Sequence, residues 1–266
     1  MKIEKMSDWE FGFPNDGPII ISGPCSAESY DQLLFSCTGV ANQGAHILRA
    51  GIWKPRTRPN SFEGIGEKAL PWLKEAGRIT RLPVIIEVAT PWHIEAALNH
   101  DIDMLWIGTR TTVSPFAMQE IAQVLSGTNI PVFVKNPINP DVNLWLGAIE
   151  RLSLAGLKQL VAIHRGFNVP DSSPYRNLPM WEIPLRLKEI IPEIELICDP
   201  SHICGSRSLL MEVSKKALEL GYKGLMIESH IQPEIALSDP SQQVTPEVLG
   251  EMINALSPSF SLHYQD

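Results

Sequence analysis

Eight short runs of apolar residues recur along the chain, and a helical pattern follows each of them. Within the runs the apolar residues are continuous rather than alternating, which is typical of parallel strands buried on both faces. The runs cover residues 18–23, 45–50, 82–88, 104–108, 131–135, 160–164, 195–199 and 224–228. Strand, loop and helix repeated eight times predict a single-domain α/β protein with a (β/α)8 TIM barrel.

Several helix beginnings carry the same local signal, a capping residue followed by proline. Ser, Thr or Asn at this position accepts a hydrogen bond from a free backbone N–H, and proline has no N–H to leave unpaired. The signal predicts helix starts at Thr90-Pro91, Ser114-Pro115, Asn139-Pro140 and Thr245-Pro246, the last opening a helix over residues 246–256.

A doubly wound open sheet is the structural alternative, but no G-x-G-x-x-G motif follows the first apolar run. No linker divides the chain, and barrels commonly use about 250 residues as one domain. We expect a short N-terminal segment over residues 1–16, the catalytic barrel over 17–258 and a C-terminal tail over 259–266.

Charge and composition narrow the possible partners. Lys and Arg number 22 against 30 Asp and Glu, a net charge of −8, which argues against nucleic acid as a partner. No apolar stretch approaches the roughly 20 residues of a membrane span, and the N-terminus lacks the pattern of a secretory signal, so we expect a cytoplasmic protein. The four cysteines are too few and scattered for a disulfide framework. Cys37, Cys198 and Cys204 are interpreted as core thiols.

Basic residues collect at the ends of the predicted strands. In a TIM barrel the carboxyl ends of all strands surround one site. Arg49, Arg110, Lys135 and Arg165 end the second, fourth, fifth and sixth runs, in a chain that is acidic overall. Because guanidinium and ammonium groups match phosphates and carboxylates, the pattern predicts a site for small molecules that carry several negative charges.

A second group could converge on one side of this site. Cys25, His202, Glu228 and Asp239 follow the first, seventh and eighth runs, which are neighbours in a closed barrel. A thiolate, an imidazole and two carboxylates suit one divalent ion of the Mn, Fe, Zn or Co class. The alternative is a buried cysteine with unrelated surface acids, and spacing alone leaves both open.

The motifs in these positions resemble a known family. The run 49–59, which contains K-P-R-T, and the segments G-P-C-S at 23–26, D-P-S-H at 199–202 and A-L-S-D at 236–239 are similar to the type I 3-deoxy-D-arabino-heptulosonate 7-phosphate (DAHP) synthases, in particular the short bacterial (beta) subgroup. The resemblance covers essentially the whole barrel. The 3-deoxy-octulosonate 8-phosphate synthases share the barrel but typically carry a K-A-N-R-type run at the K-P-R-T position.

The resemblance implies a transferase that condenses phosphoenolpyruvate with erythrose 4-phosphate, the first step of the shikimate pathway of aromatic amino acid biosynthesis, with a divalent metal. It implies metal ligands at Cys25, His202, Glu228 and Asp239. The implied phosphoenolpyruvate contacts are Arg49, Lys54, Arg110, Lys135 and Arg165, with Glu87 among them, and Arg56 and Thr57 are implied for the aldose phosphate. Lys54, Glu87 and His202 are the residues expected to take part in catalysis.

Two positions depart from the usual family pattern. Thr109 stands where Ala or Ser is usual, and His164 precedes Arg165 where an acid is frequent. The chain also shows neither the regulatory extension nor the chorismate mutase domain that some relatives carry, so an unregulated form or a piece of a longer protein is expected. A homo-oligomer, dimer or tetramer, is expected from the resemblance alone.

Other functions remain open at this level. Lys135 could form an imine in a Schiff-base aldolase, since neighbouring cations favour a neutral amine. An octulosonate synthase is the closer alternative. A non-catalytic anion-binding barrel is the third, and it predicts ligand binding without phosphate release.

Overall fold

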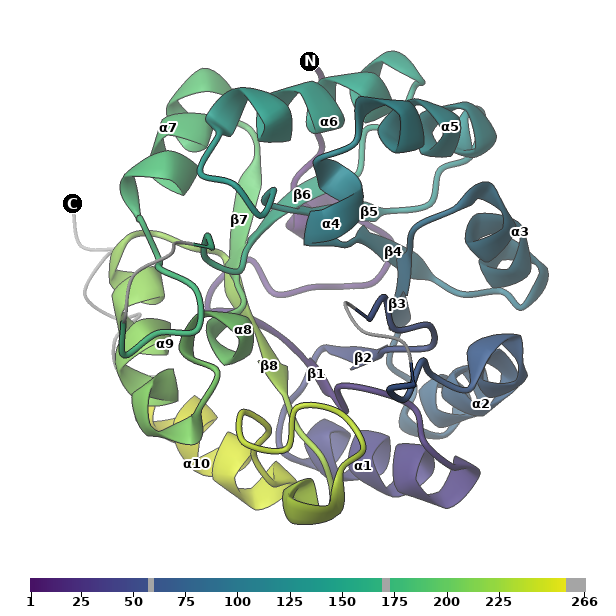
Figure 1. The fold of residues 1–266 in the computed structure, drawn as a ribbon, viewed down its shortest axis with the longest axis vertical. Helices are drawn as coiled ribbons and strands as arrows, with labels where there is room; N and C mark the ends of the chain where they lie inside the picture. The colour runs from purple at the N-terminus through teal and green to yellow at the C-terminus, as the bar shows by residue number, and fades with distance from the viewer. Residues whose placement is uncertain (57–59, 169–172, 257–266) are drawn as a thin grey trace.

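The protein is a closed barrel of parallel strands surrounded by helices (Figure 1), as the apolar pattern predicts. A computed structural model describes residues 1–56, 60–168 and 173–256. The strands are β1 Ile19–Gly23, β2 Ile47–Ala50, β3 Val84–Val88, β4 Met104–Ile107, β5 Val132–Lys135, β6 Leu160–His164, β7 Glu195–Cys198 and β8 Gly224–Glu228. The barrel closes because β8 pairs in parallel with β1, from Ile19 opposite Gly224 to Gly23 opposite Glu228.

The longer helices form the outer ring of the barrel, and the short helices α4 Thr109–Thr112 and α8 Pro200–Cys204 lie inward of that ring at the strand ends (Figure 1). The longer helices are α1 Tyr30–Asn42, α2 Leu70–Thr80, α3 Pro91–Asn99, α5 Pro115–Leu125, α6 Val142–Leu154, α7 Glu182–Ile190, α9 Leu210–Glu219 and α10 Pro246–Leu256. Short 3-10 turns lie at Met6–Asp8, Gly66–Ala69, Arg207–Leu209 and Pro233–Ile235. No helix within the described ranges has both the length and the apolar character that crossing a membrane requires.

Three of the four predicted helix starts are confirmed. Thr90 caps α3 and Ser114 caps α5, and each side chain accepts a hydrogen bond from the backbone N–H three residues further along the chain. α10 begins at Pro246. The start predicted at Asn139-Pro140 is wrong, because α6 begins at Val142. The Asp141 carboxylate caps α6 instead, accepting hydrogen bonds from the backbone N–H groups of Asn143 and Leu144.

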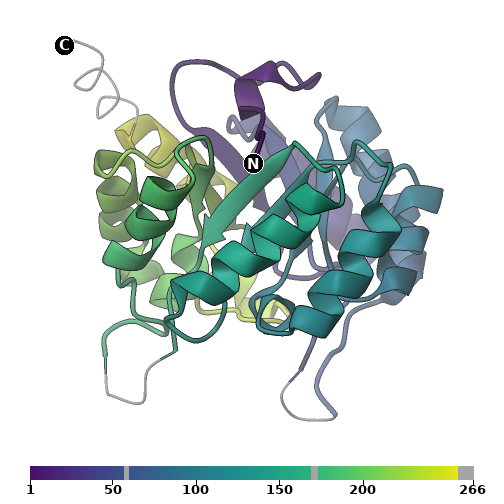
Figure 2. The ribbon, with the colours of Figure 1, turned by 90° about the horizontal axis from the view of Figure 1, so that it is seen from above.

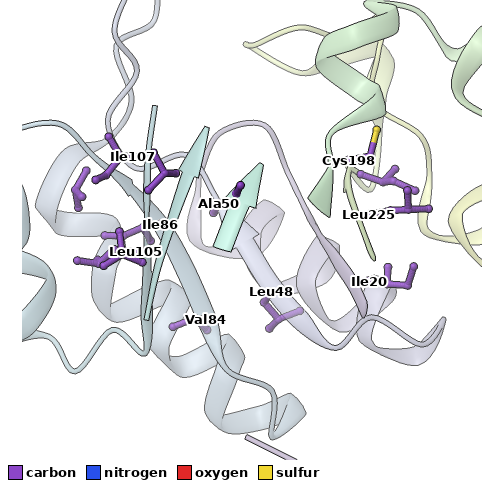
Figure 3. Close-up of a cluster of buried hydrophobic side chains, with 14 of the residues drawn as sticks. Ile20, Leu48, Ala50, Val84, Ile86, Leu105, Ile107, Cys198 and Leu225 are labelled. Atoms are coloured by element: carbon purple, nitrogen blue, oxygen red, sulfur yellow. The ribbon is translucent and has the colours of Figure 1, made fainter. Parts of the chain in front are cut away.

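The strands bury both faces, which explains their continuous apolar sequences. One face packs against the helices, where Ile20, Leu48, Ala50, Val84, Ile86, Leu105, Ile107, Cys198 and Leu225 form part of the outer core (Figure 3). The alternate residues point into the barrel and form a separate inner cluster: Ile19, Ile21, Ile47, Ile85, Met104, Trp106, Phe133, Val161, Ile163, Ile197 and Met226. Cys37, Cys198 and Cys204 all belong to the outer core, as predicted.

The N-terminal segment covers one end of the barrel (Figure 2). Met6, Trp9 and Phe13 join the inner cluster, with the Trp9 ring 5.9 Å from that of Phe133 in an edge-to-face contact. The backbone N–H of Met6 donates to Glu195 at the start of β7, at 2.6 Å. The segment therefore covers the amino ends of the strands, and the carboxyl ends remain for a functional site.

Candidate active site

The alternation inside the barrel brings charged residues to its carboxyl end. Two residues beyond the inner apolar positions Ile47, Ile85, Phe133, Ile163, Ile197 and Met226 come Arg49, Glu87, Lys135, Arg165, Asp199 and Glu228. Because side chains alternate between the two faces of a strand, these six share the inner face. Two of them lie over Trp106, whose ring centroid is 4.9 Å from Arg49 Cζ and 5.6 Å from Lys135 Nζ.

A pocket opens at this end of the barrel. Most of the charged side chains in its wall are cationic, and Glu87 and Asp239 are the anionic residues among those that line it. The lining residues are Lys54, Pro55, Arg56, Glu87, Gly108, Thr109, Arg110, Lys135, Arg165, Arg176, His202 and Asp239. A wall of this composition suits multiply charged anions.

Arg49 and Glu228 form a buried ion pair next to the pocket. Their Nη1 and Oε1 atoms are 2.6 Å apart, and neither side chain is more than 1% exposed. Burial alone would raise the pKa of Glu228, but His202, Arg49 and Lys54 together hold that pKa far below its usual value. Gln242 Nε2 donates to the other carboxylate oxygen, Oε2, at 2.7 Å. Glu228 is therefore a buried anion in a fixed orientation.

Asp199 joins Lys135 to His202. Its Oδ2 lies 2.7 Å from Lys135 Nζ and 2.8 Å from His202 Nδ1. Burial would raise the pKa of Asp199, but His202 and Lys135 hold it well below normal, while burial lowers the pKa of His202. Since an ionised carboxylate can only accept, Nδ1–H donates to it and the neutral ring keeps a lone pair at Nε2. Nε2 lies 3.9 Å from Glu228 Oε1.

Cys25 lies between Lys54 and Asp239. Lys54 Nζ is 3.0 Å from both the Sγ and the carbonyl oxygen of Cys25, and Asp239 Oδ2 is 3.4 Å from Sγ. Burial, and next the Glu228 charge, raise the pKa of the Cys25 thiol to about 12. Burial lowers the pKa of Lys54, but Cys25 and Glu228 outweigh it, so the net shift is upward. Without a further cation Cys25 is therefore protonated beside an ammonium group.

The four residues implied as metal ligands are close together but do not form a ready coordination shell. In the described parts of the chain, no three Cys, His, Asp or Glu side chains converge closely enough to hold a metal ion. Cys25 contacts Asp239, and His202 approaches Glu228, as two separate pairs. Each member except His202 is also engaged by a cation, from Lys54, Arg49 or Arg176.

The donor chemistry nevertheless fits a divalent cation. His202 is oriented through Nδ1 by a carboxylate, which is the usual outer contact of a metal-binding histidine and leaves Nε2 to ligate. The two pairs belong to one network, since Arg49 contacts both Glu228 and the carbonyl oxygen of Cys25, the latter at 3.3 Å.

Arg56, Arg110 and Arg165, which are also implied as substrate contacts, line the pocket. Arg56 donates to the carbonyl oxygen of Phe62 at 2.7 Å and to the Ser238 hydroxyl. Arg110 donates to the carbonyl oxygen of Pro55 at 3.2 Å. Arg165 is 9% exposed, and burial lowers its pKa to about 10. Thr57 lies outside the described residues.

Glu87 approaches the backbone of the neighbouring strand end. A β-carbon added at Gly108 would collide with Glu87 Oε1, so glycine is required there for the carboxylate to keep its place. Next to it, the Thr109 hydroxyl donates to the carbonyl oxygen of Asn136. The unusual Thr109 thus binds the strand-end backbone while still lining the pocket.

His164, at the end of β6, does not face the pocket. It occupies the alternate position to Arg165 and points outward, because successive strand residues face opposite sides. Nε2 donates to the carbonyl oxygen of Pro179 at 2.6 Å, and Nδ1 accepts from Tyr222 Oη at 3.0 Å. Burial lowers the pKa of His164 to about 3, so the ring is neutral.

Sequence reasoning assigned no role to two residues of the site, Asp199 and Arg176. The inner-face alternation, two residues beyond Ile197, could have identified Asp199. Arg176 lies in the long connection between β6 and α7, where no periodic pattern indicates which way a side chain points.

Comparison with known proteins agrees with this geometry. The family model described as the DAHP synthetase I family matches residues 7–261. A phospho-2-dehydro-3-deoxyheptonate aldolase of Thermotoga maritima is 29% identical over 237 residues, which are 89% of this chain and 68% of the relative. A 2-dehydro-3-deoxyphosphooctonate aldolase of a Synechococcus strain is 23% identical over 92% of this chain and 93% of its own length.

Solved structures show the same likeness. The crystal structure of a phospho-2-dehydro-3-deoxyheptonate aldolase (DAHP synthase) from Thermotoga maritima has a TM-score of 0.84 at 27% identity, covering 97% of this chain and 73% of the other. A truncated form of the 3-deoxy-D-arabino-heptulosonate 7-phosphate synthase of the same organism has a TM-score of 0.80 at 25% identity, covering 97% of this chain and 91% of the other. The charged pocket, the barrel and the family match agree: this chain belongs to the DAHP synthetase I family.

Proposed function

We propose that the pocket at the carboxyl end of the barrel condenses phosphoenolpyruvate with erythrose 4-phosphate and releases phosphate. This is the reaction of the DAHP synthases, transferases of aromatic amino acid biosynthesis, to whose family the chain belongs. One observation carries the assignment of the site: Arg49, Lys135 and Arg165 share the inner face of the barrel with Glu228, and Arg49 also contacts the backbone of Cys25.

The cationic wall would bind and orient both substrates. Together they bring roughly four to five negative charges, from two phosphates and one carboxylate. Lys135, Arg165 and Arg110 would hold phosphoenolpyruvate, together with Arg49, whose buried Nε has no hydrogen-bond partner among the described residues. Arg56, with Thr57 next to it in the sequence, would contact the phosphate of the aldose.

Cys25, His202, Glu228 and Asp239 would hold one divalent cation of the Mn, Fe, Zn or Co class. The support is their shared contact network and the oriented His202 ring, and dependence on a divalent metal is known for the family. When bound, the cation supplies Lewis-acid polarisation of the aldehyde oxygen. Because burial raises the pKa of Cys25 to about 12, binding should release the thiol proton.

Two residues would handle the proton and the water of the reaction. As C3 of phosphoenolpyruvate attacks the aldehyde carbon, negative charge develops on the aldehyde oxygen, and Lys54 Nζ is an ammonium at the pocket wall that can donate a proton to it. C2 becomes electron-deficient and takes up water, which Glu87 would orient. Loss of phosphate from the resulting adduct leaves the keto product.

The Schiff-base alternative loses its supporting argument. Cations were expected to surround Lys135, but Nζ instead forms an ion pair with Asp199 at 2.7 Å. Imine formation requires a free amine nitrogen, whereas this one is held against a buried carboxylate. Borohydride added with substrate should therefore trap no enzyme-bound imine.

A coupled assay of phosphoenolpyruvate loss tests the proposal. We expect turnover with erythrose 4-phosphate, little with arabinose 5-phosphate, and none after treatment with a chelator. Preference for arabinose 5-phosphate would favour the octulosonate reaction, which is named for relatives at 23–26% identity. Ligand binding without phosphate release would indicate a non-catalytic barrel.

Assembly and location are also proposals. We infer a homo-oligomer, dimer or tetramer, because of the family resemblance. A cytoplasmic location is supported by the four cysteines, which are all free and buried, as in a reducing compartment.

A further inference from the structure

Arg176 binds two residues of the loop that follows β8. Its Nη1 lies 2.9 Å from Asp239 Oδ1 and 2.8 Å from Gln242 Oε1. Gln242 in turn donates from Nε2 to Glu228 Oε2 at 2.7 Å. One guanidinium in the connection between β6 and α7 therefore reaches both carboxylates implied for the cation site, one of them directly and the other through an amide.

These contacts leave the second oxygen of each carboxylate facing the site. Asp239 Oδ2 lies 3.4 Å from Cys25 Sγ. Glu228 Oε1, which also accepts from Arg49 Nη1 at 2.6 Å, lies 3.9 Å from His202 Nε2. Arg176 and Gln242 thus engage Oδ1 and Oε2 and turn Oδ2 and Oε1 toward the thiol and the imidazole. A side-chain carboxylate free to rotate about its last bond would not distinguish its two oxygens in this way.

The backbone of the segments that contact Arg176 also helps to hold it in place. Asp239 has a φ of 45°, a left-handed conformation that costs energy in a residue other than glycine and persists where neighbouring contacts impose it. Gly205, which ends α8, has a φ of 67°, and a β-carbon there would lie 2.6 Å from Arg176 Cβ. The next residue, Asn177, donates from Nδ2 to the carbonyl oxygen of His202 at 2.7 Å.

We propose that Arg176 is a positioning residue for the cation site, which orients Asp239 directly and Glu228 through Gln242 so that one oxygen of each points at the metal position. The inference rests on the proposed function, because it takes these residues as the ligands. It predicts that losing the Arg176 contacts weakens cation binding, although removing a nearby positive charge by itself would strengthen it.

Arg207, in the 3-10 turn between α8 and α9, provides a matched control because it contacts the same loop after β8. It donates to the carbonyl oxygens of Gln243 and Pro240, at 2.6 and 2.8 Å, and touches none of the implied ligands. Its side chain is 42% exposed, close to the 46% of Arg176. A variant at Arg207 therefore loses loop contacts and one positive charge without disturbing the carboxylates.

Calorimetric titration of metal-free full-length protein with Co²⁺ at fixed pH tests the proposal, with the thiolate-to-cobalt absorption as a second readout. Arg176→Gln should lower the Co²⁺ affinity about tenfold to a hundredfold, the usual effect of losing such an orienting contact. Arg176→Lys, which keeps the charge but not the forked geometry, should fall between Arg176→Gln and wild type. Arg207→Gln should leave both the Co²⁺ affinity and the KM for phosphoenolpyruvate unchanged.

Three results would overturn the inference. They are Co²⁺ affinity in Arg176→Gln equal to or above that of wild type, an equal loss in Arg207→Gln, and a raised KM for a phosphate substrate with unchanged affinity, which would make Arg176 a substrate contact. Wild-type protein that neither binds Co²⁺ nor consumes phosphoenolpyruvate would refute the proposed function itself. Measuring Co²⁺ binding by the wild-type protein therefore distinguishes a failure of the proposed function from a failure of the role proposed for Arg176.

Discussion

The Lys135–Asp199 pair offers a quantitative test of how the site is held together. Asp199 is fully buried and Lys135 is 5% exposed, and their charged atoms are 2.7 Å apart. Asp199→Asn keeps the shape of the side chain but removes its charge, so Lys135 becomes a buried ammonium without a counter-ion. Breaking a buried pair from one side typically costs about 3–5 kcal/mol.

We expect the lower end of that range. An asparagine oxygen can still accept one hydrogen bond, from Lys135 or from the His202 backbone N–H that Asp199 now caps at 3.1 Å. A loss of about 3 kcal/mol corresponds to a fall of roughly 6–12 °C in melting temperature for a chain of this size. Adding Lys135→Met removes the unpaired charge, and the double variant should recover more than half of the lost stability.

Urea unfolding followed by tryptophan fluorescence measures these differences. Glu189→Gln is the control, because the Arg186–Glu189 pair is 64% and 65% exposed and should contribute nothing measurable. The reasoning is wrong if Asp199→Asn unfolds at the wild-type urea concentration. It is also wrong if the double variant is less stable than either single variant, since the pair would then not be the source of the loss.

Three further variants test other parts of the structure. Gly108→Ala should displace the Glu87 carboxylate and lower kcat about tenfold or more in the coupled assay. The control variant Gly147→Ala, in α6, should keep the wild-type kcat. If Gly108→Ala also keeps the wild-type kcat, Glu87 has no part in the mechanism. His164→Gln should flatten the acid side of the stability curve, because the folded pKa of about 3 lies below the ordinary 6.5. In the wild type, the stability that the neutral His164 contributes is present above pH 6.5 and is lost toward pH 3 at up to about 1.4 kcal/mol per pH unit. The prediction is contradicted if the urea midpoint of His164→Gln falls between pH 7 and pH 5 by as much as that of the wild type. Trp9→Ala should cost about 3–5 kcal/mol in urea unfolding with kcat preserved, because Trp9 covers the opposite end of the barrel from the pocket; a lost activity in folded protein would link the two ends.

Much of the architecture could be predicted because it depends on local, repeated signals. Continuous apolar runs identified every strand, and Thr90 and Ser114 cap helices as their chemistry predicts. The start of α6 was misplaced because Asn139 and Asp141 are both good capping residues, and only packing selects between them. The outward direction of His164 could have been inferred from the alternation of faces, because the next residue, Arg165, lies on the inner face.

The sequence by itself determined the barrel, the basic character of its carboxyl end and the family, because periodicity and motif spacing are properties of short segments. Only the tertiary structure decided which charges meet. It paired Arg49 with Glu228 and Lys135 with Asp199, turned His164 away from the pocket, and brought Arg176 from an irregular connection onto Asp239. The physical reason is that contacts between distant segments depend on how the strands close and which face each residue presents, and no local pattern encodes a partner 63 or 179 residues away.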